Sequence, residues 1–271
     1  MKKLYDHFLI KHGERVHLKD KDADYAAGLK NKEEAAERLA KNRLKMAELQ
    51  RRLFAEGKQS LLIVLQAMDA GGKDGTIRHV MKGINPQGCR VTNFRAPTSE
   101  ERAHDFLWRA HKAAPAKGMI GIFNRSHYED VLVVRVHDMV PKKVWSKRYN
   151  MINDFEAHLA DHGTRIVKFF LHISKDEQKA RFQERIDRPD KRWKVNPQDF
   201  EERKYWDDYM KAFEDVLGKC STKQAPWFVI SSDRKWFRNL AISEILVRTL
   251  EEMDPQFPRA DFDPKTLVIP D

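Results

Sequence analysis

The chain has 271 residues, of which 41% are hydrophobic and 34% charged, and its formal net charge is +10. This composition suits one large domain with its own core, and the excess of Lys and Arg favours a polyanionic ligand such as nucleic acid, an acidic membrane surface or a phosphate-rich small molecule. Cys89 and Cys220 lie far apart, no signal peptide precedes the first element, and no apolar run of about 18 residues predicts a membrane span, so we expect a soluble cytoplasmic protein without a disulfide scaffold.

The elements expected in chain order begin with a charged arm at 1–30, which we expect to be irregular and to pack on the surface or on a partner subunit. Apolar residues at helical spacing predict one long helix over 32–57. The run SLLIVLQAM at 60–68 is continuously apolar, as in a strand that is buried on both faces of a parallel sheet. Further strands are expected at 90–94, 119–123, 166–173 and 227–231, with helices at 99–111, 142–162, 175–186, 197–217 and 236–253.

This alternation predicts an α/β fold with three layers, in which helices cover both faces of a parallel five-stranded sheet. Residues 1–271 are expected to form a single domain. The segment at about 178–206 is rich in Arg and Lys and lies between two strands, so we interpret it as an inserted helical lid.

The stretch DAGGKDGT at 69–76 joins the first strand to a helix expected at 76–82. In open parallel sheets, ligands bind beyond the carboxyl ends of the strands, and glycines let backbone N–H groups approach an anion closely. The stretch matches the phosphate-loop pattern only in part, because the first glycine is absent and Asp74 replaces the Ser or Thr. An ordinary Gly-rich turn is the alternative. The phosphate-binding residues predicted here are Ala70, Gly71, Gly72, Asp74, Gly75 and Thr76, with Lys73 as the point charge.

Asp69 lies at the tip of a buried strand, where an unpaired carboxylate is costly. It could bind magnesium beside phosphates or accept a proton from an attacking oxygen, and capping of the loop amides is the structural alternative. The third strand also ends in polar residues, and among them Arg125 is suited to clamp a phosphate with two hydrogen bonds. For His127 we favour a packing or positioning role.

Three long motifs resemble the polyphosphate kinase 2 family: LQAMDAGGKDGTIRHV at 65–80, IFNRSHYEDVLVVRV at 122–136 and ERIDRPDKRWKVNPQDFEER at 184–203. The resemblance runs from about residue 10 to 250. It implies a P-loop kinase-like fold that moves a phosphoryl group between inorganic polyphosphate and a nucleotide, with Mg²⁺ or alternatively Mn²⁺. Many members carry an Asp before the Arg, whereas this chain has Asn124 there and Glu129-Asp130 further on. That variant resembles the subgroup expected to phosphorylate both AMP and ADP, with GMP and GDP as further candidate acceptors.

From the residues and the resemblance together we assign roles as expectations. Asp69, Lys73, Arg125 and Glu129 are the expected catalytic residues, and Asp69 with Glu129 or Asp130 would bind the metal ion. Asn124 is expected to bind phosphate or nucleotide, and the lid would close over the phosphates through Arg181, Arg185, Lys191, Arg192 and Lys194. Trp193 would stack on a base or pack in the core.

The expected partners are inorganic polyphosphate and nucleoside mono- and diphosphates, without nucleic acid or membrane, in a homodimer or homotetramer. An ATP-dependent nucleotide or small-molecule kinase of the same fold is the nearest alternative. A basic, non-catalytic nucleic-acid-binding protein is a second one, but aromatic residues interleave with the basic runs only at Trp193 and Trp206.

Overall fold

The computed structural model describes residues 2–29, 31–263, 267, 269 and 270. One parallel sheet has the strand order β2-β3-β1-β4-β5, so β1 is central and pairs with β3 and β4. All residues of β1 are buried, which explains why its sequence is continuously apolar and does not alternate. The predicted parallel five-stranded sheet is therefore confirmed. Its strands are β1 Ser60–Gln66, β2 Cys89–Asn93, β3 Ile120–Asn124, β4 Thr164–His172 and β5 Trp227–Ser231.

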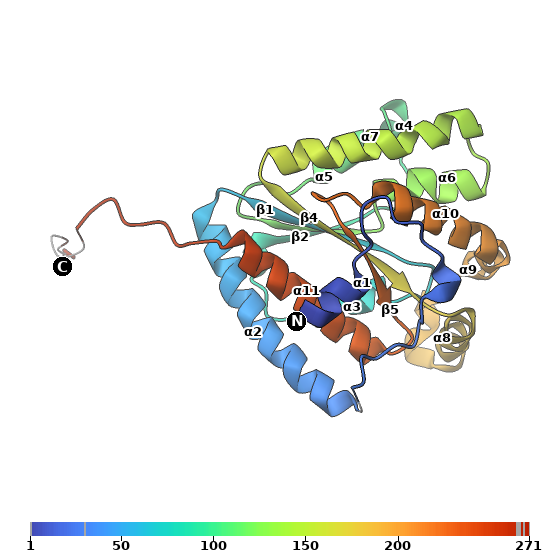
Figure 1. Ribbon diagram of the computed structural model, residues 1–271, viewed down its shortest axis with the longest axis horizontal. Helices are drawn as coiled ribbons and strands as arrows, with labels where there is room; N and C mark the ends of the chain where they lie inside the picture. Colours follow the sequence, from blue (N-terminus) through green and yellow to red (C-terminus); the bar gives the residue numbers. More distant parts are fainter. Residues whose placement is uncertain (1, 30, 264–266, 268, 271) are drawn as a thin grey trace.

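Helices cover both faces of the sheet (Figure 1), so the expected three-layer arrangement is also confirmed. Alternate residues of β1 enter two separate cores: Leu61 packs on the side of α2 and α11, and Leu62 packs on the side of α7 and α10. The first layer contains α1 Lys2–Phe8, α2 Lys32–Glu56, α3 Lys73–Val80 and α11 Lys235–Met253. The second contains α5 Trp108–Ala113, α6 Val133–Val136, α7 Lys142–Asp161 and α10 Trp206–Cys220.

Two helices expected as single elements are interrupted. The segment 99–111 forms α4 Ser99–Ala103 and α5, because the chain turns at Asp105, whose carboxylate accepts from the Leu107 N–H and whose carbonyl accepts from the Trp108 N–H. The segment 197–217 forms α9 Pro197–Glu202, a 3₁₀ turn and α10. Helix α3 begins at Lys73 and not at 76.

The N-terminal arm is more regular than expected, and it packs on its own chain. Helix α1 lies against α11 and β5, and the Ile10 N–H donates to the Trp227 carbonyl at 2.9 Å. Leu9 forms an antiparallel bridge with Phe228, and Phe8 is buried beneath. The arm thus covers the β5 edge of the sheet, which would otherwise present unpaired backbone groups.

The basic segment expected as a lid follows β4 and lies at the carboxyl ends of the strands (Figure 1). It consists of α8 Lys175–Asp187, a 3₁₀ helix at Pro189–Lys194, and α9. At the other end of the chain, residues 258–263 extend away from the body of the molecule (Figure 1). Within the described ranges, no helix has the length and apolar character needed to cross a bilayer.

Candidate functional site

The loop at 67–72 joins β1 to α3 in an unusual backbone conformation. Ala70 has φ 57° and Gly72 has φ 107°, both in the left-handed region that favours glycine. A Cβ added at Gly72 would lie 1.8 Å from Nη1 of Arg238. Glycine at 72 is therefore favoured both by its backbone conformation and by the position of the Arg238 side chain.

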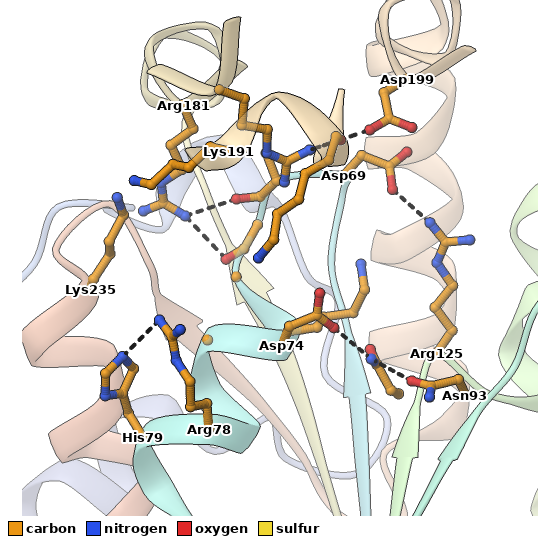
Figure 2. Close-up of a pocket in the computed structure, with 18 of the residues that line it drawn as sticks. Asp69, Asp74, Arg78, His79, Asn93, Arg125, Arg181, Lys191, Asp199 and Lys235 are labelled. Carbon is orange, nitrogen blue, oxygen red and sulfur yellow. Dashed lines mark hydrogen bonds and ion pairs between the residues drawn. The ribbon is translucent and has the colours of Figure 1, made fainter. Parts of the chain in front are cut away.

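A cavity of about 640 Å³ opens beside this loop at the carboxyl ends of the strands (Figure 2). Ten Lys and Arg side chains line it against four carboxylates, counting only the part of the chain that the structure describes. Such a concave surface with an excess of positive charge suits a polyanion of several phosphates.

Asp69 and Arg125 meet at the mouth of the loop, where Arg125 Nη2 donates to Asp69 Oδ1 at 2.6 Å (Figure 2). Lys73 Nζ lies close to them and donates to the carbonyls of Ala67 at 2.9 Å and Met68 at 3.5 Å. Burial, reinforced by the positive charge of Arg125, lowers the pKa of Lys73 to about 8. A bound anion would favour the protonated amine and raise that pKa again.

Asn124 connects two neighbouring strand ends to the loop. Its Nδ2 donates to Asp74 Oδ1 at 2.8 Å and to Asn93 Oδ1 at 2.8 Å. Asn124 therefore holds the first turn of α3 against β2 and β3, and it also lines the large cavity.

A second cavity of about 230 Å³ adjoins the first and shares Asp69, Arg125 and Asp199 with it. Glu129 lines this second cavity, and burial raises its pKa while Arg125 and Lys73 oppose the shift. Much of the remaining wall is apolar or aromatic, formed by Ala67, Met68, Leu132, Val133, Tyr209 and Phe213. The Asp69–Arg125 pair therefore stands between a basic cavity and a partly apolar one.

Asp130, in contrast, lies outside the lining of both cavities. Its carboxylate pairs with Arg148 Nη1 at 3.0 Å and with Arg109 Nη2 at 3.9 Å. Burial raises its pKa to about 6. Of the two adjacent carboxylates at 129 and 130, only Glu129 faces the site.

Within the described residues, no group of three or more His, Cys, Asp or Glu side chains could hold a metal ion. Asp69 and Glu129, however, both line the second cavity. Magnesium in phosphate-transferring sites is held by one or two carboxylates together with water and substrate phosphates. These two residues therefore fit a magnesium ion that arrives with phosphate, and they do not form a closed protein cage.

The expected lid residues differ in their surroundings. Arg185, Lys191 and Lys194 line the large cavity, and so does Trp193, which is 77% exposed and does not pack in the core. Arg192 lies outside both linings and donates to the Ile186 carbonyl at 2.9 Å.

Two further expected residues are held inside the protein. Arg181 borders the large cavity but is 5% exposed, with its guanidinium bound to backbone carbonyls. Thr76 is buried as well, and its hydroxyl has no hydrogen-bond partner in the described part of the chain.

Several site residues were not expected from the sequence: Asn93, Arg95, Gln178, Lys235 and Arg238. Asn93 ends β2, and Lys235 and Arg238 follow β5. The usable signal was the polar residue after each strand, because all carboxyl ends of a parallel sheet meet at one edge. His127 is fully buried against Glu156, as its expected packing role requires.

Known proteins are similar to this chain in sequence and in structure over nearly its whole length. The AMP/ADP-polyphosphate phosphotransferase of Meiothermus ruber is 52% identical over 94% of this chain and 96% of its own. The ADP-polyphosphate phosphotransferase of Rhodopseudomonas palustris is 45% identical over 93% and 91%. The crystal structure of polyphosphate kinase 2 from Arthrobacter aurescens TC1 superposes with a TM-score of 0.90 at 43% identity, covering 95% of each chain, which confirms the P-loop kinase-like fold. Residues 29–258 match the polyphosphate kinase 2 family, and the chain belongs to that family.

Proposed function

We propose that the protein is a polyphosphate-dependent nucleotide kinase, which transfers a phosphoryl group between inorganic polyphosphate and AMP or ADP. One observation carries the proposal: the Asp69–Arg125 pair and Lys73 lie where a basic cavity of about 640 Å³ meets a smaller cavity of about 230 Å³. Two substrates bound in these two cavities would meet at the pair. The relatives from Meiothermus ruber and Rhodopseudomonas palustris are named for phosphoryl transfer with polyphosphate and AMP or ADP, which supports this choice of substrates.

Polyphosphate is assigned to the larger cavity, because the cations that line it match a chain with many negative charges. Arg185, Lys191 and Lys194 come from the lid side, and Lys235 comes from the start of α11. Binding of a polyanion releases counterions, so its affinity should fall steeply as salt rises.

The nucleotide is assigned to the smaller cavity. Leu132, Val133 and Phe213 offer an apolar surface for a base or ribose, and the phosphate would lie near Asp69 and Arg125, which the two cavities share. GMP and GDP are further candidate acceptors.

In the transfer, an oxygen of the acceptor's terminal phosphate would attack the terminal phosphorus of polyphosphate in line with the bridging oxygen. The new P–O bond forms as the bond to the bridging oxygen breaks, and the shortened polyphosphate leaves with the negative charge. Lys73 and Arg125 would stabilise that charge, and Asp69 would orient the acceptor oxygen. Magnesium, or alternatively manganese, would be held by Asp69 and Glu129 with phosphate oxygens and would supply further charge neutralisation.

Incubation with polyphosphate and AMP, ADP or GDP as separate acceptors, without ATP, tests the proposal by product analysis. We expect ADP from AMP and ATP from ADP. Phosphorylation that requires added ATP as donor would instead identify an ATP-dependent kinase. Tight duplex binding in a gel shift without phosphoryl transfer would identify a nucleic-acid-binding protein.

We also propose that the chain is a single domain that acts in the cytoplasm as a homodimer or homotetramer, without nucleic-acid or membrane partners. The exposed apolar side chains of Leu44 and Phe54 on α2 support a subunit contact. Light scattering after size exclusion measures the number of subunits.

A further inference from the structure

Every peptide carbonyl from Ala67 to Gly71 accepts a hydrogen bond from a side chain. Lys73 binds the first two carbonyls, at residues 67 and 68. The next three are held by residues from outside the loop: Gln178 Nε2 donates to the Asp69 carbonyl at 2.9 Å, Arg181 Nη1 to the Ala70 and Gly71 carbonyls at 3.0 and 3.3 Å, and Arg238 Nη1 to the Gly71 carbonyl at 3.4 Å.

Arg181 has no donor left for a substrate. Its five hydrogen bonds go to Glu177, to the two loop carbonyls, and to the carbonyls of Ser232 and Asp233 after β5, which equals the number of N–H donors on a guanidinium. The residue is only 5% exposed. Arg185, one turn further along α8, lines the same cavity, but within the described residues it is hydrogen-bonded only to the Lys194 carbonyl at 3.4 Å and to Asp199 at 3.5 Å, so its role differs from that of Arg181.

Gln178 and Arg238 are also buried, and each binds a second side chain as well as the loop. Gln178 is 1% exposed, and its Oε1 accepts from Arg203 Nη1 at 2.7 Å while its amide nitrogen binds the loop. Arg238 is 2% exposed, and its Nη2 donates to Asn239 Oδ1 at 2.9 Å. Side chains of α8 and α11 thus bind the carbonyl groups of the loop.

In a trans peptide unit, the carbonyl and the following N–H point to opposite sides. Side chains that fix the carbonyls of residues 69–71 therefore also fix the direction of the N–H groups of residues 70–72. The Gly71 N–H donates to the Met68 carbonyl at 3.0 Å within the loop, so in the described part of the chain the N–H groups of Ala70 and Gly72 remain for a ligand. Donors oriented before the reaction stabilise a developing negative charge without any reorganisation. We infer that Gln178 and Arg181 are positioning residues, which orient the N–H groups of Ala70 and Gly72 for the transferred phosphate and do not touch it, while Arg238 supports the Gly71 carbonyl beside them. This inference rests on the proposed phosphoryl transfer for its kinetic consequence.

The inference is tested with Arg181→Lys, which keeps the charge but cannot reach several carbonyls, and with Gln178→Glu, which keeps the acceptor for Arg203 but loses the donor to the loop. Hydrogen–deuterium exchange of a peptide that spans 67–76 is measured in the ligand-free protein, together with kcat and KM for polyphosphate. We expect faster exchange in both variants and a fall in kcat on the order of 100-fold, because misplaced catalytic groups lower the rate steeply. The KM for polyphosphate should change far less than kcat.

Arg185→Met is the matched control, because Arg185 lies on the same helix and lines the same cavity. It should raise the KM for polyphosphate and leave the exchange of 67–76 at the wild-type rate. Wild-type exchange in the Gln178 and Arg181 variants would overturn the inference, and so would faster exchange with unchanged kcat. If Arg181→Lys does not fold, as judged by thermal unfolding, Gln178→Glu alone decides. A wild-type protein without polyphosphate-dependent activity but with the expected exchange pattern would refute the proposed function and leave the loop anchoring intact.

Discussion

Gly72→Ala tests the physical basis of the loop most directly. The substitution has a backbone component, because the residue has φ +107°, where an L-amino acid is strained by about 1–3 kcal/mol. It also has a steric component, because the new Cβ would lie 1.8 Å from Nη1 of Arg238. We therefore expect Gly72→Ala to destabilise the fold and to remove activity.

The steric component can be estimated from the contacts that Arg238 would lose. The overlapping atom is the end of a long side chain, so the guanidinium can move, but Arg238 is only 2% exposed and has few other places to go. Moving it breaks the bonds to the Gly71 carbonyl at 3.4 Å and to Asn239 Oδ1 at 2.9 Å. A hydrogen bond from a charged group contributes about 1.5–3 kcal/mol, so loss of roughly one such bond is the minimum.

Gly83→Ala is the matched control, since Gly83 has φ +93° and an added Cβ would meet nothing within 4 Å. Urea unfolding of both variants should show that Gly72→Ala costs about 1.5–3 kcal/mol more than Gly83→Ala. In an Arg238→Ala background this excess should disappear, as a double-mutant cycle would show. Equal destabilisation by the two glycine substitutions would refute the reasoning.

Four further outcomes are expected. Because the lowered pKa of Lys73 is about 8, its cation is lost as pH rises through that value, so kcat/KM should fall there, and Lys73→Arg should remove the inflection. Asp69→Asn should abolish nucleotide phosphorylation without changing the urea midpoint appreciably; near-normal turnover would contradict its assigned role. Glu129→Ala should reduce the use of AMP more than that of ADP, and equal losses would count against that assignment. Lys168→Met leaves the buried carboxylate of Glu156 without its ammonium partner and should cost about 3–5 kcal/mol, most of which Glu156→Leu should restore in the double variant.

The sequence by itself was sufficient for the layered fold and for the position of the loop. Both depend on neighbours in the chain: an apolar run such as 60–68 can only be a buried strand or helix segment, and the glycines and lysine that follow stand within a few residues of it. The carboxyl ends of parallel strands share one edge, so Asp69 and Arg125 could be expected to lie close together. In the structure, Arg125 Nη2 lies 2.6 Å from Asp69 Oδ1.

The tertiary structure alone decided which of two similar residues faces the site. Glu129 and Asp130 are adjacent carboxylates, yet Asp130 turns to Arg148 and Arg109, which come from other helices. Arg181 and Arg185 lie one turn apart on α8, and the sequence of this basic segment does not distinguish them. In the structure, the Arg181 guanidinium donates to backbone carbonyls that follow β1 and β5. The groups that bind the side chains of Asp130 and Arg181 lie far away in the sequence, and only the packing of the fold brings them together. No local sequence pattern could therefore predict which of these side chains faces the site.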